Sequence, residues 1–295
     1  MSFARDLMDQ TLRSVEEISA VLELPILGVV PSMPKKLSIT DRGQRVHKDS
    51  ESSVAEAYRT IRTAVFFGAP KNEAKTILVT SPAPGDGKST LTSNLAIAMA
   101  QAGRKVIILD ADFRKPMQHR IFNVNHNNVG LSNIIAGITA SGEAIRPTEV
   151  EGLELLPCGR SVPNPSEMLN SDSFAQLLEI LSDRYDRLII DAPPIMPVTD
   201  AQILAEICDI TLLVLRADKS TRKTSQQARD GLLSVGANIL GALVNDVPKK
   251  GRYGYYSGYG YKDSYGYGRS RKKKAGDREP MARTVESDRF AGSDA

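Results

Sequence analysis

The chain has 295 residues, of which 41% are hydrophobic and 25% are charged, as is typical of a folded globular protein. No apolar run approaches the ~18 residues that a membrane-spanning helix needs, and the sequence MSFARDLMDQ lacks the apolar core of a secretory signal. The two cysteines, Cys158 and Cys208, stand far apart, which argues against a disulfide framework and a CxxC metal site. We therefore expect a cytoplasmic protein and not an integral membrane protein.

The formal net charge of +3 hides an uneven distribution along the chain. Residues 248–274 contain six Lys, three Arg and one Asp, which gives this short segment a charge of +8 and leaves −5 for all other residues. A mildly acidic body argues against a general nucleic-acid-binding surface. We expect no nucleic-acid partner.

The first 68 residues are predicted to form two helices separated by an extended segment and a linker. Apolar residues recur at helical spacing up to residue 22, and PILGVVP then favours an extended segment. Residues 35–53 are polar and show no periodicity, which is typical of a linker. In residues 53–68, Val54, Tyr58, Ile61 and Val65 share one face, which predicts a helix.

From residue 75 onward, short apolar runs alternate with helical patterns. Strands are predicted at 76–81, 106–110, 153–157, 187–191, 211–216 and 239–246, and helices at 89–102, 172–184, 199–208 and 221–235. Continuous Val, Ile and Leu strands joined by helices indicate a parallel sheet covered on both faces. The predicted fold class is α/β, with a doubly wound, mainly parallel sheet.

Residues 248–295 differ in composition from the rest of the chain. They contain seven of the nine tyrosines, interleaved with glycine and followed by the basic sequence RSRKKK. These tyrosines are Tyr253, Tyr255, Tyr256, Tyr259, Tyr261, Tyr265 and Tyr267. Such a composition cannot bury a hydrophobic core, so we predict that residues 248–295 are disordered.

The sequence SPAPGDGKST, at 81–90, lies where a predicted strand is followed by a helix, which is where a phosphate-binding loop is expected. Gly85 and Gly87 allow backbone N–H groups to turn toward phosphate oxygens, and the helix N-terminus adds its positive dipole. Lys88 would reach the β- and γ-phosphates, and Ser89 would offer its hydroxyl to Mg²⁺. The usual pattern GxxxxGK[ST] has glycine where this chain has Pro82.

Carboxylates stand at the ends of two further predicted strands. VIILDAD contains Asp110 and Asp112, and LIIDAPP contains Asp191. Because the carboxyl ends of neighbouring parallel strands form the ligand crevice, the three acids are expected to converge on the phosphate loop. Ser89, one or two of these carboxylates and phosphate oxygens would provide the hard oxygen ligands that Mg²⁺ prefers. The alternative for any single Asp is a helix cap or a turn.

Taken together, PGDGKST, VIILDADFRKP and LIIDAPP resemble the bacterial tyrosine kinases that govern capsule and exopolysaccharide export. The phosphate-loop domain of that family resembles the chromosome-partition and division-site ATPases. EAYRTIR is similar to the family's ExxRxxR helix through Glu56, Arg59 and Arg62, and the tyrosine cluster is similar to its autophosphorylation tail. The partition ATPases carry a signature lysine where this chain has Ala83, which favours the kinase branch.

The resemblance implies ATP and Mg²⁺ as cofactors. Residues implied to bind the nucleotide are Pro84, Gly85, Asp86, Gly87, Lys88, Ser89, Thr90 and Asp191; those linked to the metal are Ser89, Asp110, Asp112 and Asp191. Lys88, Asp110 and Asp112 would be catalytic, and one of the two acids, Asp110 by preference, would accept the tyrosine proton. Asp191 would hold the metal through water. Glu56, Arg59 and Arg62 would join subunits into a homo-oligomeric ring.

The resemblance also implies a division of the chain into a juxtamembrane-like segment and linker at 1–53, a kinase domain at 54–247 and a tail at 248–295. The implied partners are an integral membrane chain-length regulator, in the same polypeptide or as a separate chain, and an opposing tyrosine phosphatase. The implied location is the inner face of the plasma membrane.

The expected function is ATP- and Mg²⁺-dependent autophosphorylation of the tyrosine cluster, which regulates polysaccharide polymerisation and export. Two alternatives stay open. One is a partition-type switch ATPase that uses its basic tail on DNA or membrane, and the other is a nucleotide-binding adaptor whose tail another kinase phosphorylates.

Overall fold

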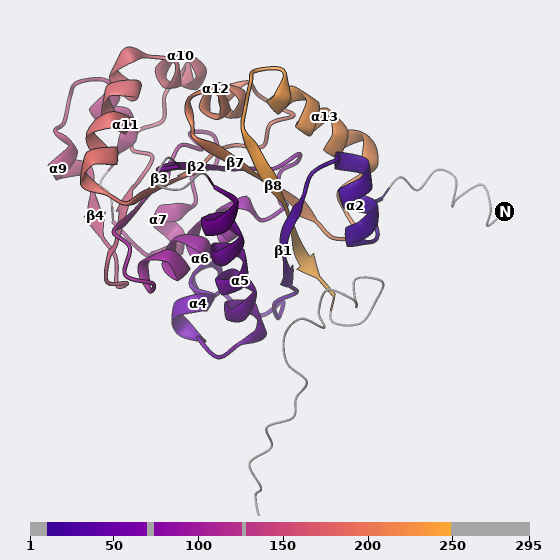
Figure 1. The fold of residues 1–295 in the computed structure, drawn as a ribbon. Helices are drawn as coiled ribbons and strands as arrows, with labels where there is room; N and C mark the ends of the chain where they lie inside the picture. The colour runs from indigo at the N-terminus through magenta and orange to yellow at the C-terminus, as the bar shows by residue number, and fades with distance from the viewer. Residues whose placement is uncertain (1–10, 70–73, 126–127, 249–295) are drawn as a thin grey trace, which may run out of the picture. The chain divides into compact units, whose positions relative to one another are not determined.

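A computed structural model describes residues 11–69, 74–125 and 128–248, and the structural statements below concern these residues. They form an eight-stranded sheet in the order β1-β8-β7-β2-β6-β3-β5-β4, with helices on both faces (Figure 1). The strand pairs are parallel except that of β4 with β5, at one edge of the sheet. The predicted α/β class, doubly wound with a mainly parallel sheet, is confirmed.

The strands are β1 (Ile26–Pro31), β2 (Thr76–Thr80), β3 (Val106–Asp110), β4 (Arg146–Pro147), β5 (Leu153–Leu156), β6 (Arg187–Asp191), β7 (Ile210–Arg216) and β8 (Ile239–Val247). The longer helices are α2 (Val15–Leu22), α5 (Ser53–Gly68), α6 (Lys88–Ala100), α11 (Asp172–Arg184), α12 (Asp200–Ile207) and α13 (Arg222–Leu233). The short helices are α3 (Ile39–Gly43), α4 (Arg45–Lys48), α7 (Gln118–Ile121), α8 (Leu131–Ile135), α9 (Ser141–Ala144) and α10 (Pro165–Leu169). None of the described helices is long and apolar enough to cross a membrane.

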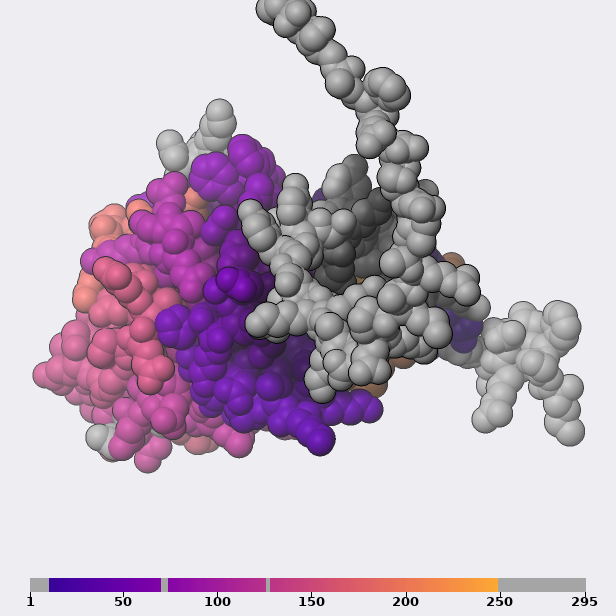
Figure 2. All heavy atoms as spheres, turned by 90° about the horizontal axis from the view of Figure 1, so that it is seen from below, coloured from indigo at the N-terminus to yellow at the C-terminus, as the bar shows by residue number. Residues whose placement is uncertain are grey.

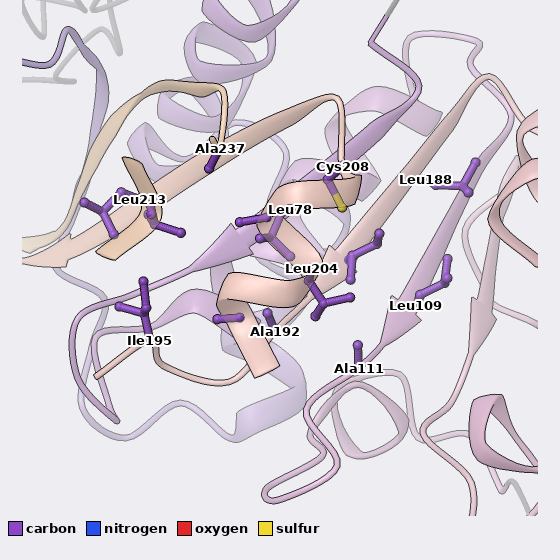
Figure 3. Close-up of a cluster of buried hydrophobic side chains, with 14 of the residues drawn as sticks. Leu78, Leu109, Ala111, Leu188, Ala192, Ile195, Leu204, Cys208, Leu213 and Ala237 are labelled. Carbon is purple, nitrogen blue, oxygen red and sulfur yellow. The ribbon is translucent and has the colours of Figure 1, made fainter. Parts of the chain in front are cut away.

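The hydrophobic core lies on both faces of the sheet. In the central strand β2, Ile77 and Val79 belong to the buried cluster that includes residues of α5 and α6, whereas Leu78 belongs to the cluster that includes residues of α11, α12 and α13. Figure 3 shows part of the second cluster, where Leu204 and Cys208 lie at α12 and its C-terminal end. Burial on both faces explains why the strands consist of continuous apolar runs.

The N-terminal segment belongs to the same sheet. Strand β1 pairs in parallel with β8, and α5 packs closely over it, since a Cβ added at Gly28 would lie 2.6 Å from Cγ1 of Ile61. Helix α2 buries Val15, Ile18 and Leu22, and these residues belong to the same core cluster as α13. The extended segment is thus present, and the predicted helix is present over residues 15–22, whereas residues 11–14 are not helical and its predicted start lies outside the described residues. Both elements contribute to the core.

Residues 35–53, which were predicted to be a linker, contain the helices α3 and α4. Both are tied to the rest of the domain: Nε2 of Gln44 donates to the Ile121 carbonyl oxygen (2.8 Å), and the backbone N–H of Val46 donates to Oδ1 of Asn94 (2.9 Å). The linker prediction is wrong for residues 39–48, because helices of four or five residues are too short to show a hydrophobic period.

Seen from below, the violet N-terminal segments and the magenta middle of the chain form one continuous surface (Figure 2).

Candidate active site

The phosphate loop, residues 81–90, connects β2 to α6 and turns at two glycines with left-handed backbone conformation. The φ angles are +89° at Gly85 and +97° at Gly87. A Cβ at Gly87 would lie 1.9 Å from Nδ2 of Asn245, whereas a Cβ at Gly85 would meet nothing within 4 Å. Gly87 is also the N-cap of α6, so the free N–H groups of the first helical turn are available to a phosphate. The predicted nucleotide-binding residues follow one another along this loop and turn: Pro84, Gly85, Asp86, Gly87, Lys88, Ser89 and Thr90.

Residues at the ends of β7 and β8, which no sequence motif indicates, hold the phosphate loop in place. Nδ2 of Asn245 donates to the Asp86 carbonyl oxygen (2.9 Å), and Nη1 of Arg216 donates to the Gly85 carbonyl oxygen (3.0 Å). Arg216 is itself fixed by Asp246, whose Oδ2 lies 2.7 Å from Nη2. The two contacts with the loop join residues more than a hundred positions apart, so no local sequence pattern could have indicated them.

Asp86 stabilises the loop from within. Its Oδ2 accepts a hydrogen bond from the backbone N–H of Ala83 (2.9 Å), and the residue is only 5% exposed. Burial raises the pKa of Asp86 to about 6, although the Ala83 N–H and the nearby Arg216 favour the charged form. The hydroxyl of Ser81 donates to the Ala83 carbonyl oxygen (2.9 Å) and so spans Pro82, the position at which the sequence departs from the usual pattern.

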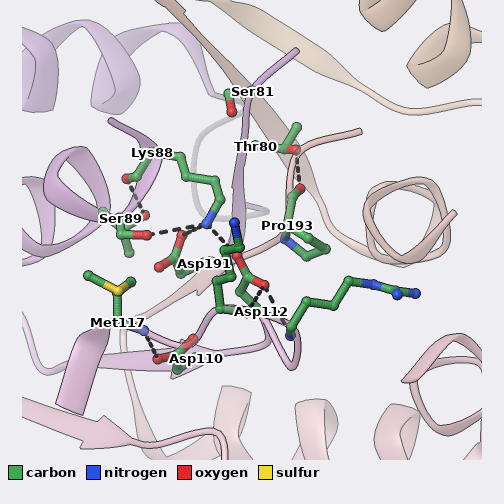
Figure 4. Close-up of polar contacts among 12 residues, drawn as sticks. Thr80, Ser81, Lys88, Ser89, Asp110, Asp112, Met117, Asp191 and Pro193 are labelled. Atoms are coloured by element: carbon green, nitrogen blue, oxygen red, sulfur yellow. Dashed lines mark hydrogen bonds and ion pairs between the residues drawn. The ribbon is translucent and has the colours of Figure 1, made fainter. Parts of the chain in front are cut away.

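The three carboxylates lie together, as predicted. Asp110 and Asp191 are register neighbours at the ends of β3 and β6, Asp112 lies two residues beyond Asp110, and all three are buried. Nζ of Lys88 lies 2.8 Å from Oδ2 of Asp112 and 3.3 Å from Oδ1 of Asp191 (Figure 4). It also donates to Oγ of Ser89 (3.2 Å). The loop lysine therefore joins the phosphate loop to the carboxylates of two strands.

Negative charge exceeds positive charge in this buried cluster. Burial alone would lower the pKa of Lys88, but the charges of Asp191 and Asp112 outweigh burial, so the pKa of Lys88 is raised. Burial and the charge of Asp191 raise the pKa of Asp110 to about 8, against the lowering effect of its hydrogen bond from Gln118. A cation placed among these groups would favour their charged forms.

The residues present fit a magnesium ion. Oδ2 of Asp110 accepts hydrogen bonds from the backbone N–H groups of Met117 (3.0 Å) and Gln118 (2.9 Å), whereas its buried Oδ1 has no hydrogen-bond partner among the described residues. Across all described residues, no group of three His, Cys, Asp or Glu side chains could hold a metal ion by itself. Ser89, nucleotide phosphates and water would have to supply the remaining ligands, which is how Mg²⁺ is commonly bound.

A second ion pair fixes the segment that follows β3. Oδ1 of Asp112 accepts hydrogen bonds from the backbone N–H groups of Arg114 (3.2 Å) and Lys115 (2.9 Å). The Arg114 side chain reaches the buried Asp200, with Nε 3.0 Å from Oδ2, and Oγ of Ser166 donates to Oδ1 of the same carboxylate (2.5 Å). The segment that carries Asp112 is thereby anchored to α10 and α12.

The other predicted functional residues do not lie in this cluster. Glu56, Arg59 and Arg62 lie on α5, where Oε2 of Glu56 is 2.9 Å from Nη1 of Arg59. Nη1 of Arg62 donates to the Ala98 carbonyl oxygen, near the C-terminus of α6 (3.0 Å). The seven predicted tyrosine substrates, at 253–267, lie outside the described residues.

The fold and the site define the chain as a phosphate-loop nucleoside triphosphatase of the division-site ATPase type. The family described as "AAA domain" matches residues 74–226. The septum site-determining protein MinD of Pyrococcus horikoshii, solved as a complex with Mg-ADP, is 25% identical with a TM-score of 0.51 over 59% of this chain and 74% of MinD.

Within that class, the chain is similar to tyrosine kinases. It is 42% identical over 215 residues to the proposed tyrosine-protein kinase CapB of Staphylococcus aureus. These residues cover 72% of this chain and 94% of CapB. The solved kinase domain of the Escherichia coli tyrosine kinase Etk matches with a TM-score of 0.73 at 28% identity, over 86% of this chain and 99% of that domain. In the sequence comparison, Etk of Escherichia coli K12 is 36% identical over 203 residues, which are 69% of this chain and 28% of Etk. The chain belongs to the bacterial tyrosine kinases, and its activity is that of a protein-tyrosine kinase.

Proposed function

We propose that this kinase uses ATP and Mg²⁺ to phosphorylate the tyrosines at 253–267 of its own chain, and that this autophosphorylation regulates the polymerisation and export of capsular or extracellular polysaccharide. The observation that carries the proposal is the contact of Lys88 with Asp112 and Asp191 directly behind the phosphate loop. This arrangement provides a cation for phosphate oxygens and carboxylates for a metal ion.

The position of β8 supports the choice of substrate. Asn245, on β8, donates a hydrogen bond to the phosphate loop, and the first tyrosine of the cluster, Tyr253, follows eight residues later. Eight extended residues span up to ~28 Å. The tyrosine cluster therefore begins within reach of the site of its own chain.

In the proposed reaction, each residue has a distinct role. Lys88 compensates the charge of the β- and γ-phosphates, and the N–H groups of the loop orient them. The magnesium ion, held through Ser89, Asp110, Asp112 and Asp191, would neutralise charge on the transferred phosphoryl group. Asp110 accepts the proton of the tyrosine hydroxyl as the tyrosine oxygen takes the γ-phosphoryl group and ADP leaves.

We further propose three partners and a location. Glu56, Arg59 and Arg62 join copies of the chain into a ring, and the exposed position of Glu56 supports this. An integral membrane chain-length regulator activates the kinase at the inner face of the plasma membrane, and a tyrosine phosphatase opposes it. Full-length Etk is longer than the region that matches this chain, so this relative contains a further segment.

The experiment is to treat the purified protein with phosphatase, incubate it with Mg·ATP and map phosphate by mass spectrometry, beside the variant Lys88→Met. We expect phosphate on the tyrosines at 253–267 only in the unmutated protein. ATP turnover without phosphotyrosine, also in the presence of the membrane partner, would instead support the switch ATPase. The adaptor would be supported if the purified protein does not phosphorylate itself but a cell extract labels the unmutated protein and Lys88→Met equally.

A further inference from the structure

Helix α7 begins with a residue that touches three parts of the site. Gln118 is fully buried. Its backbone N–H donates to Oδ2 of Asp110 (2.9 Å), and its side-chain Nε2 donates both to Oδ2 of Asp191 (2.8 Å) and to the Ser89 carbonyl oxygen (3.1 Å). One residue thus connects the ends of β3 and β6 with the first turn of α6.

The chemistry of the partners fixes the orientation of the Gln118 amide. A backbone carbonyl oxygen and an ionised carboxylate can only accept hydrogen bonds, so the amide nitrogen must face Ser89 and Asp191. The amide oxygen, Oε1, then points away from them, is buried and has no hydrogen-bond partner among the described residues. Such an atom is satisfied when an internal water or another donor enters the site.

An amide is well suited to this position because it donates hydrogen bonds without adding charge. Among the described residues, the carboxylate of Asp191 has two partners: Nε2 of Gln118 at 2.8 Å and Nζ of Lys88 at the longer distance of 3.3 Å. Lys88 is also the residue that would contact the nucleotide, so its contact with Asp191 can be exchanged for one with phosphate. The hydrogen bond from Gln118 does not depend on Lys88.

We propose that Gln118 is a positioning residue that holds Asp191 and the first turn of α6 in the arrangement that binds Mg²⁺ with the nucleotide. The inference rests on the proposed use of Mg²⁺ at this site. Hydrogen bonds that orient metal-binding groups commonly account for 10- to 100-fold in metal affinity. Gln118 therefore controls how strongly Mg²⁺ increases nucleotide binding, and has little effect on the binding of metal-free nucleotide.

The test is to titrate the full chain with a fluorescent ADP analogue at a series of Mg²⁺ concentrations and in EDTA. In Gln118→Met, which keeps the length of the side chain and removes both donors, we expect the Mg²⁺ concentration for half-maximal enhancement of binding to rise about tenfold or more. Affinity in EDTA should change less than threefold. Gln118→Ser, which leaves room for water in place of an apolar group, should give a shift in the same direction and guards against misfolding of the first variant.

Gln44→Met is the matched control. Gln44 is a buried glutamine whose Nε2 donates to the Ile121 carbonyl oxygen of the same helix α7 (2.8 Å), but it does not contact the carboxylates. It should lower thermal stability without moving the Mg²⁺ dependence. Unchanged Mg²⁺ dependence in both Gln118 variants, or an equal shift in Gln44→Met, would overturn the inference. An unmutated protein whose nucleotide binding ignores Mg²⁺ would instead overturn the proposed cofactor.

Discussion

The two glycines of the phosphate loop have the same backbone conformation but different surroundings. Both have positive φ, yet a Cβ would meet nothing at Gly85 and would collide with Nδ2 of Asn245 at Gly87. Gly85→Ala should therefore cost only the backbone strain of about 1–2 kcal/mol. Gly87→Ala should in addition displace Asn245, which holds the loop, so we expect it to abolish binding of a fluorescent nucleotide, while Gly85→Ala binds within tenfold of the unmutated protein. Equal loss in both variants would show that strain alone matters.

The raised pKa of Asp86 predicts a stability effect that depends on pH. In the unfolded chain an aspartate ionises near pH 4, but in the folded protein Asp86 ionises at about 6. Between these values the folded state binds more protons than the unfolded state, so stability falls as pH rises from 4 to 6. Asp86→Asn removes this loss and its amide oxygen can still accept from Ala83. We expect the free energy of unfolding of the variant, relative to the unmutated protein, to rise from pH 4 to pH 6 and then level off, with a total gain of about 3 kcal/mol. Melting temperatures of both proteins at a series of pH values would show it. A difference that is constant with pH would refute the role of burial.

Strand β1 is integral to the kinase domain because it pairs with β8 and α5 packs on it at Gly28. A Cβ at Gly28 would lie 2.6 Å from Cγ1 of Ile61, whereas one at Gly142, on α9, would meet nothing within 4 Å. We expect Gly28→Ala to lower the free energy of unfolding of the whole domain by about 1–3 kcal/mol, as overpacking does. Gly142→Ala should change it by less than about 1 kcal/mol. The measurement is urea unfolding, and a domain indifferent to Gly28→Ala would indicate that residues 1–53 form a separate unit, as the sequence suggested.

Elements with a strong local signal could be predicted from the sequence, and those that depend on distant partners could not. The runs that became β2, β3 and β6 have continuous apolar centres because both faces of the sheet are buried, so their positions and the convergence of Asp110 and Asp191 followed from the pattern. Nothing in the sequence ILGVVP, however, says that it pairs with β8. Likewise, Gln118 belongs to no sequence motif. Its importance comes from hydrogen-bond acceptors on β6 and α6, and only the fold brings these acceptors close to it.

Phosphorylation of the tyrosine cluster would reverse the charge of residues 248–274. Residues 248–274 carry +8 and all other residues together −5, so the opposite charges favour attraction while the tyrosines are unmodified. Each phosphotyrosine adds about −1.5 to −2, and modification of all seven tyrosines would bring about −10 to −14. The segment would then be negative and would repel both the body and the same segment of a neighbouring chain.

This reversal predicts that phosphorylation separates the proposed ring into smaller species, and light scattering of the phosphorylated and phosphatase-treated protein would measure it. The variant Glu56→Lys, which we expect not to assemble, provides the mass of the unassembled chain for comparison. Its partner in the monomer is Arg59, and exposed pairs of this kind contribute less than about 1 kcal/mol, so the variant should fold normally. We expect the phosphorylated protein to approach the mass of Glu56→Lys at low salt and to recover part of its assembly at high salt, since screening weakens repulsion between exposed charges. An oligomer of equal mass with and without phosphate would contradict the charge argument. An oligomer that survives Glu56→Lys would contradict the interface on α5.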